Sequence, residues 1–304
     1  MHYNIIQCAY LRLRKSTNGG DVLIKVGINL LLWTDSIALE KDRPLMDKVL
    51  DMGFDGLEIP VHAGMTVEEA KKIGAYLAER NVPSSALTVF FPDSANPVSP
   101  DKTLRDGAVS AFRLYADCAK ALGSNILVGP FPQGLGYFSG QRPTKQEWDW
   151  SVDTLKRCCD YAGGLGLDVA IEPLNRFEQY MLNTAEDGVR YVKEIGMDHV
   201  GLLLDTHHAN IEELDVAEAF KSALPYTKHI HISENDRGIP GTGHACAKEV
   251  FDVIKQSGYS GWLTIEAFNE GAPSLQAPLH LWRTFAPSDD DLARQGLAYI
   301  KRMI

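Results

Sequence analysis

The sequence predicts an α/β fold, a single (β/α)8 barrel of the TIM-barrel type, and two observations support this prediction. Short apolar runs, each suited to one buried parallel strand, recur along the chain between helical stretches. Four of these runs end directly in a residue that can bind a metal ion: Glu172, Asp205, His231 and Glu266. By subtraction these residues are 33, 26 and 35 apart, close to the ~30 residues of one strand–helix unit. They therefore belong at equivalent places on four successive strands.

In the first half of the chain, glycines and capping residues mark the ends of the elements. Gly53 and Gly123 each close a helix, and Thr66 is placed to cap another helix that carries Glu68 and Glu69 in its first turn. We expect strands at residues 25–33, 56–61, 84–90 and 125–128, and helices at 44–52, 66–80, 101–122 and 145–165. The loops at 91–100 and 129–144 are long, as lids and binding loops often are.

The second half repeats the same rhythm more regularly. We expect strands at residues 169–171, 200–205, 228–233 and 261–266, and helices at 184–195, 216–224, 245–256 and 288–304. Ser288 is the expected cap of the last helix, and three aspartates follow it in the first turn. Eight strands that alternate with eight helices are the numbers found in a TIM barrel. A doubly wound open sheet is the alternative architecture.

Composition and length limit the class of protein. We expect one barrel domain at residues 23–304, preceded by an N-terminal extension, residues 1–22, of unknown role. The net charge of −10 comes without a concentrated basic face, which disfavours nucleic acid or an anionic membrane as the main partner. The five cysteines show no C-x-x-C spacing, and no apolar run approaches the ~20 residues of a membrane span. With no signal-peptide pattern either, we expect a cytoplasmic protein.

The four strand-end residues form a set of metal donors. Three carboxylates and one imidazole suit Mn²⁺, Mg²⁺ or Co²⁺ better than a structural zinc site. A single carboxylate at a strand end is more often a solvated or capping residue than a ligand. Because four such residues occur in register on consecutive strands, the pattern favours a divalent-metal site.

The residues around these four positions carry a family resemblance. The chain reads Ile-Glu-Pro-Leu-Asn-Arg-Phe-Glu at 171–178, Asp-Thr-His-His-Ala-Asn-Ile-Glu-Glu at 205–213, His-Ile-Ser-Glu-Asn-Asp-Arg at 231–237 and Thr-Ile-Glu-Ala-Phe at 264–268. Together these segments resemble the ketose 3-epimerases of the tagatose/psicose 3-epimerase family, within the xylose-isomerase-like barrel superfamily. The resemblance extends over about residues 24–304.

This resemblance implies a function and a role for each matched residue. The substrate would be a free ketose inverted at C3, the cofactor a divalent metal with Mn²⁺ favoured over Co²⁺ or Mg²⁺, and the assembly a homodimer or homotetramer. The matched metal ligands are Glu172, Asp205, His231 and Glu266. Two of them, Glu172 and Glu266, match the pair that exchanges protons with the sugar. The positions that hold the sugar hydroxyls match Glu178, His208 and Arg237.

The chemistry of epimerisation requires such residues whatever the family. A proton beside a ketone is too weakly acidic for an unaided carboxylate, and a divalent ion stabilises the developing enediolate as a Lewis acid and template. Inversion then needs one acid/base on each face of the planar intermediate. An arginine at position 237 has the planar fork suited to holding oxygens.

Other residues near these segments have less specific interpretations. His207 stands where the family usually has an aromatic, so we expect packing rather than ligation. Glu58, inside a predicted strand, is expected to be a buried partner of the site. Trp33 and Phe268 could form an apolar wall beside the sugar or belong to the core. Asn29 and residues 84–88 depart from the pattern of the best-known relatives, which leaves the identity of the ketose open.

Several alternatives share parts of this pattern. An aldose–ketose or hydroxypyruvate-type isomerase, or an inosose dehydratase, would use the same metal-and-carboxylate layout on a different carbon. A phosphodiesterase like the abasic-site endonucleases would need more metal ligands and a basic face. A sugar-binding barrel without activity would need no pair of opposed glutamates. The loop at 237–243 could bind phosphate through its amides, but it contains no lysine, so we interpret it as a turn that positions Arg237.

Overall fold

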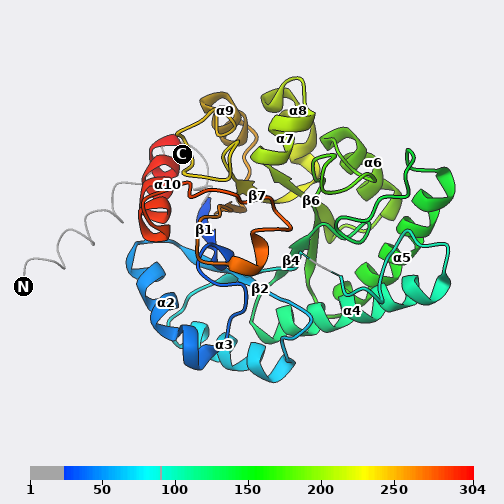
Figure 1. Ribbon diagram of the computed structural model, residues 1–304, viewed down its shortest axis with the longest axis horizontal. Coiled ribbons are helices and arrows are strands. Elements are labelled where there is room, and N and C mark those ends of the chain that lie inside the picture. Colours follow the sequence, from blue (N-terminus) through cyan, green and yellow to red (C-terminus); the bar gives the residue numbers. More distant parts are fainter. Residues whose placement is uncertain (1–23, 90) are drawn as a thin grey trace, which may run out of the picture.

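The computed structural model describes residues 24–89 and 91–304, so the predicted extension at 1–22 lies outside the described residues. Eight strands form a closed barrel in which each strand pairs with the next along the chain and β8 pairs with β1, all in parallel. Figure 1 shows the strands at the centre, with the helices in a ring around them. The prediction of one (β/α)8 barrel is confirmed, and the open doubly wound sheet is excluded.

The strands are short and almost wholly buried, as parallel strands covered on both faces must be. Their bounds are β1 Lys25–Asn29, β2 Gly56–Pro60, β3 Ser84–Leu87, β4 Ile126–Gly129, β5 Asp168–Ile171, β6 Val200–Asp205, β7 Thr227–Ile232 and β8 Trp262–Ile265. The α-helices are α2 Leu39–Asp51, α3 Val67–Glu79, α4 Lys102–Ala121, α5 Lys145–Gly164, α6 Ala185–Ile195, α7 Thr206–Glu212, α8 Val216–Ala223, α9 Lys248–Gln256 and α10 Asp289–Met303. Short 3-10 helices are η1 Leu30–Leu32, η2 Leu224–Tyr226 and η3 Pro273–Leu275.

The predicted caps are present. The hydroxyl of Thr66 accepts a hydrogen bond from the Glu69 amide at 3.2 Å, and that of Ser288 accepts one from the Asp291 amide at 3.0 Å. Each cap satisfies an amide that has no partner within its helix, and the acidic residues in the first turn complement the positive end of the helix dipole. These helix starts are therefore encoded locally.

Several element boundaries were predicted wrongly, and helix α7 was not predicted. Strand β3, expected to reach residue 90, ends at Leu87. The strand expected to reach Trp33 ends at Asn29, because the Asn29 side chain accepts a hydrogen bond from the Leu31 amide at 2.9 Å and starts η1. Helix α2 begins at Leu39 instead of Pro44, since the Asp42 carboxylate accepts from the Ala38 amide at 2.8 Å and supports an earlier start. Helix α9 begins at Lys248 rather than 245.

The segment that follows β8 covers the end of the barrel at which the strands finish. Residues between β8 and α10, drawn in orange to red in Figure 1, lie across the centre of the barrel end. Asn269 holds the base of this segment: its Nδ2 donates to Ala286 O at 3.3 Å and to Asp289 Oδ1 at 3.0 Å. In the described chain, no helix is both long and apolar enough to cross a membrane.

Candidate metal and active site

The four predicted metal ligands meet at the carboxyl ends of the barrel strands. Nδ1 of His231, on β7, lies 3.8 Å from Glu172 Oε1, 3.8 Å from Asp205 Oδ2 and 3.6 Å from Glu266 Oε1. All four side chains are buried, and one donor atom from each lies within 4.8 Å of all the others. The sequence prediction that these residues converge is therefore confirmed by the geometry.

Barrel closure and hydrogen bonds of the backbone place these side chains. Asp205 and His231 are register partners on β6 and β7. The Glu172 amide donates to Gly129 O at 3.0 Å, and the Glu266 amide donates to Ile232 O at 3.3 Å, so both glutamates extend the sheet pattern past their strands. At Gly129 an added Cβ would lie 2.1 Å from a backbone oxygen, so only glycine allows this close approach.

The cluster fits a divalent metal ion. Among the described residues, neither Glu172 Oε1 nor His231 Nδ1 has a hydrogen-bond partner, although both atoms are buried. A buried polar atom without a partner is costly, so these two atoms are suited to bind a cation. Two donors at about 2.1 Å from one ion lie at most about 4.2 Å apart, and the separations of 3.6 to 3.8 Å fall within that limit.

The electrostatics of the cluster also favour a cation. Burial, reinforced by the charge of Glu266, raises the pKa of Glu172 well above its usual range. Burial likewise raises the pKa of Asp205 to about 7 against the opposing effect of Arg237. Burial also acts to raise the pKa of Glu266, but His231 and Arg237 outweigh it and lower that pKa to about 2. The two predicted acid/bases are thus shifted in opposite directions, a pattern that suits two different proton-transfer roles.

Arg237 makes close contact with two of the four candidate ligands. Its Nη1 lies 2.6 Å from Glu266 Oε2 and 3.2 Å from Asp205 Oδ2. The backbone of Arg237 has φ +63°, a left-handed conformation that is uncommon for a residue with a side chain. Strained backbone of this kind is often found at functional sites, and here it turns the guanidinium into the barrel mouth.

The glycine-containing loop after β7 serves to hold Arg237, as predicted. The Glu234 carboxylate accepts hydrogen bonds from the amides of Asn235 at 3.0 Å, Gly241 at 2.9 Å and Ala245 at 2.7 Å. Because these amides already donate to Glu234, they are not available to bind a phosphate. The role of Glu234 was missed in the sequence, because a carboxylate two residues after a strand has no distinctive pattern.

His208 and Glu178 lie beside Arg237. The Asn175 amide nitrogen lies 3.1 Å from His208 Nδ1, and Arg237 Nη2, which can only donate, lies 3.0 Å from His208 Nε2. Burial and the charge of Arg237 hold the pKa of His208 well below its usual range, which keeps the ring neutral. Oε1 of Glu178 lies 3.9 Å from Arg237 Nη2. All three residues predicted to hold the sugar therefore line one side of the cluster.

The remaining candidates have simpler roles. His207 is buried, with Nδ1 3.0 Å from Glu234 O, as expected for a packing residue. Phe268 lines the cavity above the cluster, whereas Trp33 does not line it and donates from Nε1 to Asp290 Oδ1 at 2.9 Å. Glu58 is fully buried against His229 and His231, so the expectation of a buried partner is confirmed. His229 was missed, although its position two residues before His231 places it on the same face of the strand.

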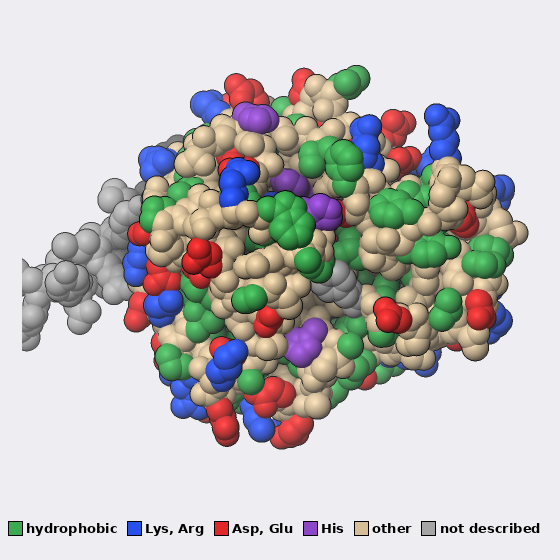
Figure 2. Space-filling view, in the orientation of Figure 1, with side chains coloured by type: hydrophobic (Ala, Val, Ile, Leu, Met, Phe, Trp, Pro, Cys, Tyr) green, Lys and Arg blue, Asp and Glu red, His purple; other side chains and the backbone are tan. Residues whose placement is uncertain are grey.

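The cavity above the cluster is small. It has a volume of about 20 Å³, room for roughly one water molecule. Its polar lining consists of Glu172, Glu178, His208, Arg237 and Glu266, and its apolar lining consists of Leu31, Val89, Pro130, Leu174, Phe268, Leu275 and Leu279. Figure 2 shows histidine and hydrophobic side chains near the centre of this face, with charged side chains scattered over the rest of it, many of them towards the edge.

The protein is a closed parallel barrel, and a buried cluster of carboxylates and a histidine lies at the carboxyl ends of its strands. These two features define a TIM-barrel enzyme with a candidate metal centre. Residues 46–303 match the family model described as "Xylose isomerase-like TIM barrel", and the chain belongs to this family. Within the family it belongs with the ketose 3-epimerases, which are isomerases that act on carbohydrates.

Three relatives support this assignment over nearly the whole chain. The chain is 31% identical to a probable ketose 3-epimerase of Synechocystis, covering 92% of this chain and 96% of that protein. It is also 31% identical to a D-psicose 3-epimerase of Ruminiclostridium cellulolyticum, and the alignment covers 88% of this chain and 92% of that protein. The crystal structure of a D-allulose 3-epimerase from Methylomonas, in complex with D-allulose, superposes on this chain with a TM-score of 0.86 at 28% identity. The superposition covers 93% of this chain and 98% of that chain.

Proposed function

We propose that the protein is a divalent-metal-dependent epimerase that inverts C3 of a free ketose, with Glu172 and Glu266 as the two acid/bases. The observation that carries the proposal is the convergence of Glu172, Asp205, His231 and Glu266, two of whose buried donor atoms have no hydrogen-bond partner within residues 24–89 and 91–304. We favour Mn²⁺ as the bound ion, with Co²⁺ or Mg²⁺ as substitutes, because three carboxylates and one imidazole are hard or intermediate donors.

The four converging residues would hold the metal, which when bound polarises the ketone and stabilises negative charge on the substrate. Glu172 and Glu266 extend from β5 and β8, on different sides of the barrel. One glutamate removes the C3 proton, which leaves a planar cis-enediolate. The other glutamate delivers a proton to the opposite face, so C3 is inverted and no atom is gained or lost.

Arg237 supplies hydrogen-bond donors on one side of the cavity, beside His208. Its Nη2, which can only donate, lies 3.0 Å from His208 Nε2. These two side chains are placed to hold a carbonyl or hydroxyl oxygen of the sugar on this side of the cavity. Glu178, an acceptor, is placed to bind a sugar hydroxyl beside them.

A deuterium wash-in experiment tests the reaction. The Mn²⁺-loaded protein is incubated in D₂O with a panel of free ketoses, and the sugars are followed by NMR. Deuterium at C3 together with the C3 epimer supports the proposal and identifies the substrate. Deuterium at C1 with formation of an aldose would replace it with an aldose–ketose isomerase, and loss of water would replace it with a dehydratase. A metal-loaded protein that exchanges no proton on any of these sugars would contradict it.

We further propose that the enzyme works in the cytoplasm as a homodimer or homotetramer. The cysteines in the described part of the chain are buried free thiols, which suit a reducing compartment. Tyr137 is 38% exposed and Phe138 is 45% exposed. The centres of their rings lie 6.3 Å and 6.2 Å from the ring centre of Tyr180. Exposed aromatic groups of this kind are typical of association surfaces. Light scattering on the wild type and on Phe138→Ser tests this, because a monomeric wild type contradicts the proposal.

A further inference from the structure

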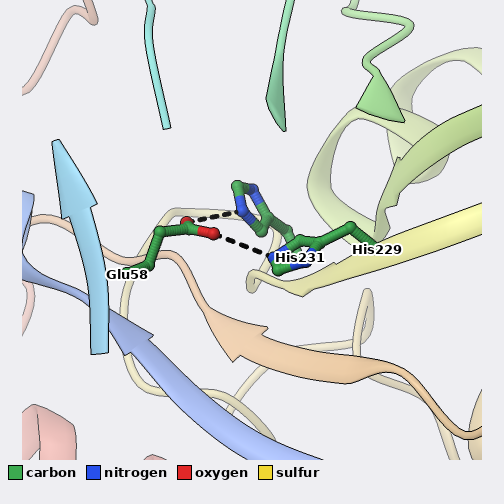
Figure 3. A group of neighbouring side chains, drawn as sticks. All are labelled: Glu58, His229 and His231. Atoms are coloured by element: carbon green, nitrogen blue, oxygen red, sulfur yellow. Dashed lines mark hydrogen bonds and ion pairs between the residues drawn. The ribbon is translucent and has the colours of Figure 1, made fainter. Parts of the chain in front are cut away.

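A second polar cluster is buried in the barrel next to the four candidate metal ligands. It consists of Glu58 on β2 and the two histidines of β7, His229 and His231 (Figure 3). Glu58 Oε1 lies 2.8 Å from His231 Nε2, and Glu58 Oε2 lies 2.9 Å from His229 Nε2. Each of these residues has an exposed fraction of 0%. The proposed reaction uses only His231 of the three, so the other two need a separate explanation.

The Glu58 carboxylate has hydrogen-bond partners on both of its oxygens. Besides His231 Nε2, Asn29 Nδ2 donates to Oε1 at 3.2 Å and Ser85 Oγ donates to Oε2 at 2.8 Å, whereas His229 Nε2 lies near Oε2 without the geometry of a hydrogen bond. Asn29, Glu58 and Ser85 are register partners on three adjacent strands, so the sheet itself sets these contacts. Burial acts to raise the pKa of Glu58, but the two histidines lower it below its usual range. The barrel therefore stabilises a carboxylate in a place where an isolated charge would be very costly.

The position of Glu58 determines which nitrogen of His231 faces the metal ligands. An imidazole binds a metal through a nitrogen without hydrogen, and the hydrogen bond made by its other nitrogen selects that tautomer. With Glu58 accepting from Nε2–H, the neutral His231 ring that a metal requires carries its lone pair on Nδ1. This is the atom that lies 3.6 to 3.8 Å from the donor oxygens of Glu172, Asp205 and Glu266.

We propose that Glu58 is a positioning residue for the metal centre, and that it acts by holding the His231 ring with Nδ1 directed at the other three ligands. The inference rests on the proposed metal site and adds a residue to it. His229 lies beside this contact, with its Nε2 2.9 Å from the other oxygen of Glu58. The two histidines lie on one face of β7, two residues apart, so one carboxylate from β2 reaches both.

The test compares Mn²⁺ binding by the wild type with that of Glu58→Ala, Glu58→Gln and Ser85→Ala. Partners of a metal-bound histidine typically contribute 10–100-fold in metal affinity, so we expect a loss of roughly this size in Glu58→Ala. Glu58→Gln should lose less, because the amide oxygen can still accept from His231 Nε2–H without providing a charge. Ser85→Ala is the matched control, since Ser85 contacts only the oxygen that faces His229, and it should bind Mn²⁺ about as tightly as the wild type.

A spectroscopic measurement separates positioning from a merely structural effect. Electron spin-echo modulation from a histidine nitrogen should be present in the Mn²⁺-loaded wild type and in Ser85→Ala, and weak or absent in Glu58→Ala. Thermal unfolding of the metal-free variants shows whether they fold, and if Glu58→Ala does not, Glu58→Gln carries the test.

The outcomes distinguish this inference from the proposed function. A wild type that binds no divalent ion would overturn the metal site and the role of Glu58 together. A wild type that binds Mn²⁺ with a histidine signal, combined with unchanged affinity and signal in both folded Glu58 variants, would overturn the role of Glu58 alone. Weaker binding and a reduced nitrogen signal in the Glu58 variants, with Ser85→Ala like the wild type, would support it.

Discussion

Arg237 Nη1 lies 2.6 Å from Oε2 of Glu266, while the other oxygen of the same carboxylate, Oε1, lies 3.6 Å from His231 Nδ1. One carboxylate thus contacts a fixed positive charge through one oxygen and the candidate metal ligands through the other. This arrangement keeps Glu266 ionised, since His231 and Arg237 lower its pKa to about 2 against the effect of burial. An ionised carboxylate held in this way is suited to accept a proton from the sugar.

The contacts of Arg237 lead to a prediction about substrate use. We expect Arg237→Ala to lower kcat/KM by roughly 10–100-fold, because hydrogen bonds to a charged group contribute about 1.5–3 kcal/mol. Metal content should not fall, since Arg237 offers no metal donor and its positive charge opposes a cation. Steady-state kinetics and metal analysis on the same preparations check both statements. Arg237→Lys is the control, and a metal-free Arg237→Ala would show that the residue supports the metal site instead.

The proposed acid/bases lead to a second prediction. Glu172→Gln and Glu266→Gln should each lower turnover by roughly 10²–10⁴-fold or more, because an amide cannot carry the transferred proton. Deuterium incorporation at C3 is the measurement, and Mn²⁺ titration shows whether metal is still bound. Glu218→Gln is the matched control and should act like the wild type, because Glu218 is exposed and forms an ion pair with Lys221 on the outside of the barrel. Activity close to the wild type in either site variant contradicts a mechanism with two bases.

The pKa shifts of the metal-free cluster lead to a prediction about pH. In the unfolded chain an aspartate titrates near 3.9, whereas burial raises the pKa of Asp205 to about 7 in the fold. A group with a raised pKa contributes stability that is complete below about pH 4 and is lost as the pH rises through 7. Burial and the charge of Glu266 raise the pKa of Glu172, which acts in the same direction.

We therefore expect the Tm of the metal-free protein to fall between about pH 7 and pH 8.5. At lower pH the buried histidines oppose this trend, because burial lowers the pKa of His207 and His208, which are then neutral in the fold but protonated in the unfolded chain below about pH 6.5. Because a metal binds only the deprotonated ligands, Mn²⁺ should raise the Tm more at about pH 8.5 than at pH 7. Thermal unfolding in EDTA and in excess Mn²⁺ across this range is the measurement. In Glu172→Gln and Asp205→Asn the pH dependence of the metal-free protein should be smaller. A Tm that rises from about pH 7 to pH 8.5 in EDTA contradicts the assignment.

The small cavity leads to a prediction about access. A volume of about 20 Å³ cannot hold a ketose, and Leu275 and Leu279 of the segment after β8 form part of its wall. This segment must therefore move when a sugar enters, as lids of barrel enzymes do. We expect amide hydrogen exchange at residues 269–287 to slow when a ketose is added to the Mn²⁺-loaded enzyme. Helix α4 is the internal control, and equal exchange with and without the sugar would argue against a moving segment.

Much of the site was predictable, because residues spaced by one strand–helix unit lie at the same end of neighbouring strands in a barrel. Each strand–helix unit returns the chain to the same end of the barrel, so Glu172, Asp205, His231 and Glu266 could be assigned to one site from their intervals and apolar runs. The capped helix starts at Thr66 and Ser288 were also predictable, because a cap depends on residues three positions apart. Boundaries set by side-chain hydrogen bonds, such as the end of β1 at Asn29, were not predictable from periodicity.

The sequence by itself determined the eight strands, the set of candidate metal donors and the family, since each of these depends on local pattern and on motifs within short segments. The tertiary structure alone decided that Glu58 meets His229 and His231, residues separated by more than half of the chain. Their contact exists because the sheet closes on itself and directs side chains from β2 and β7 into one interior. No local pattern encodes that meeting, because the intervening residues affect it only through the closure of the barrel.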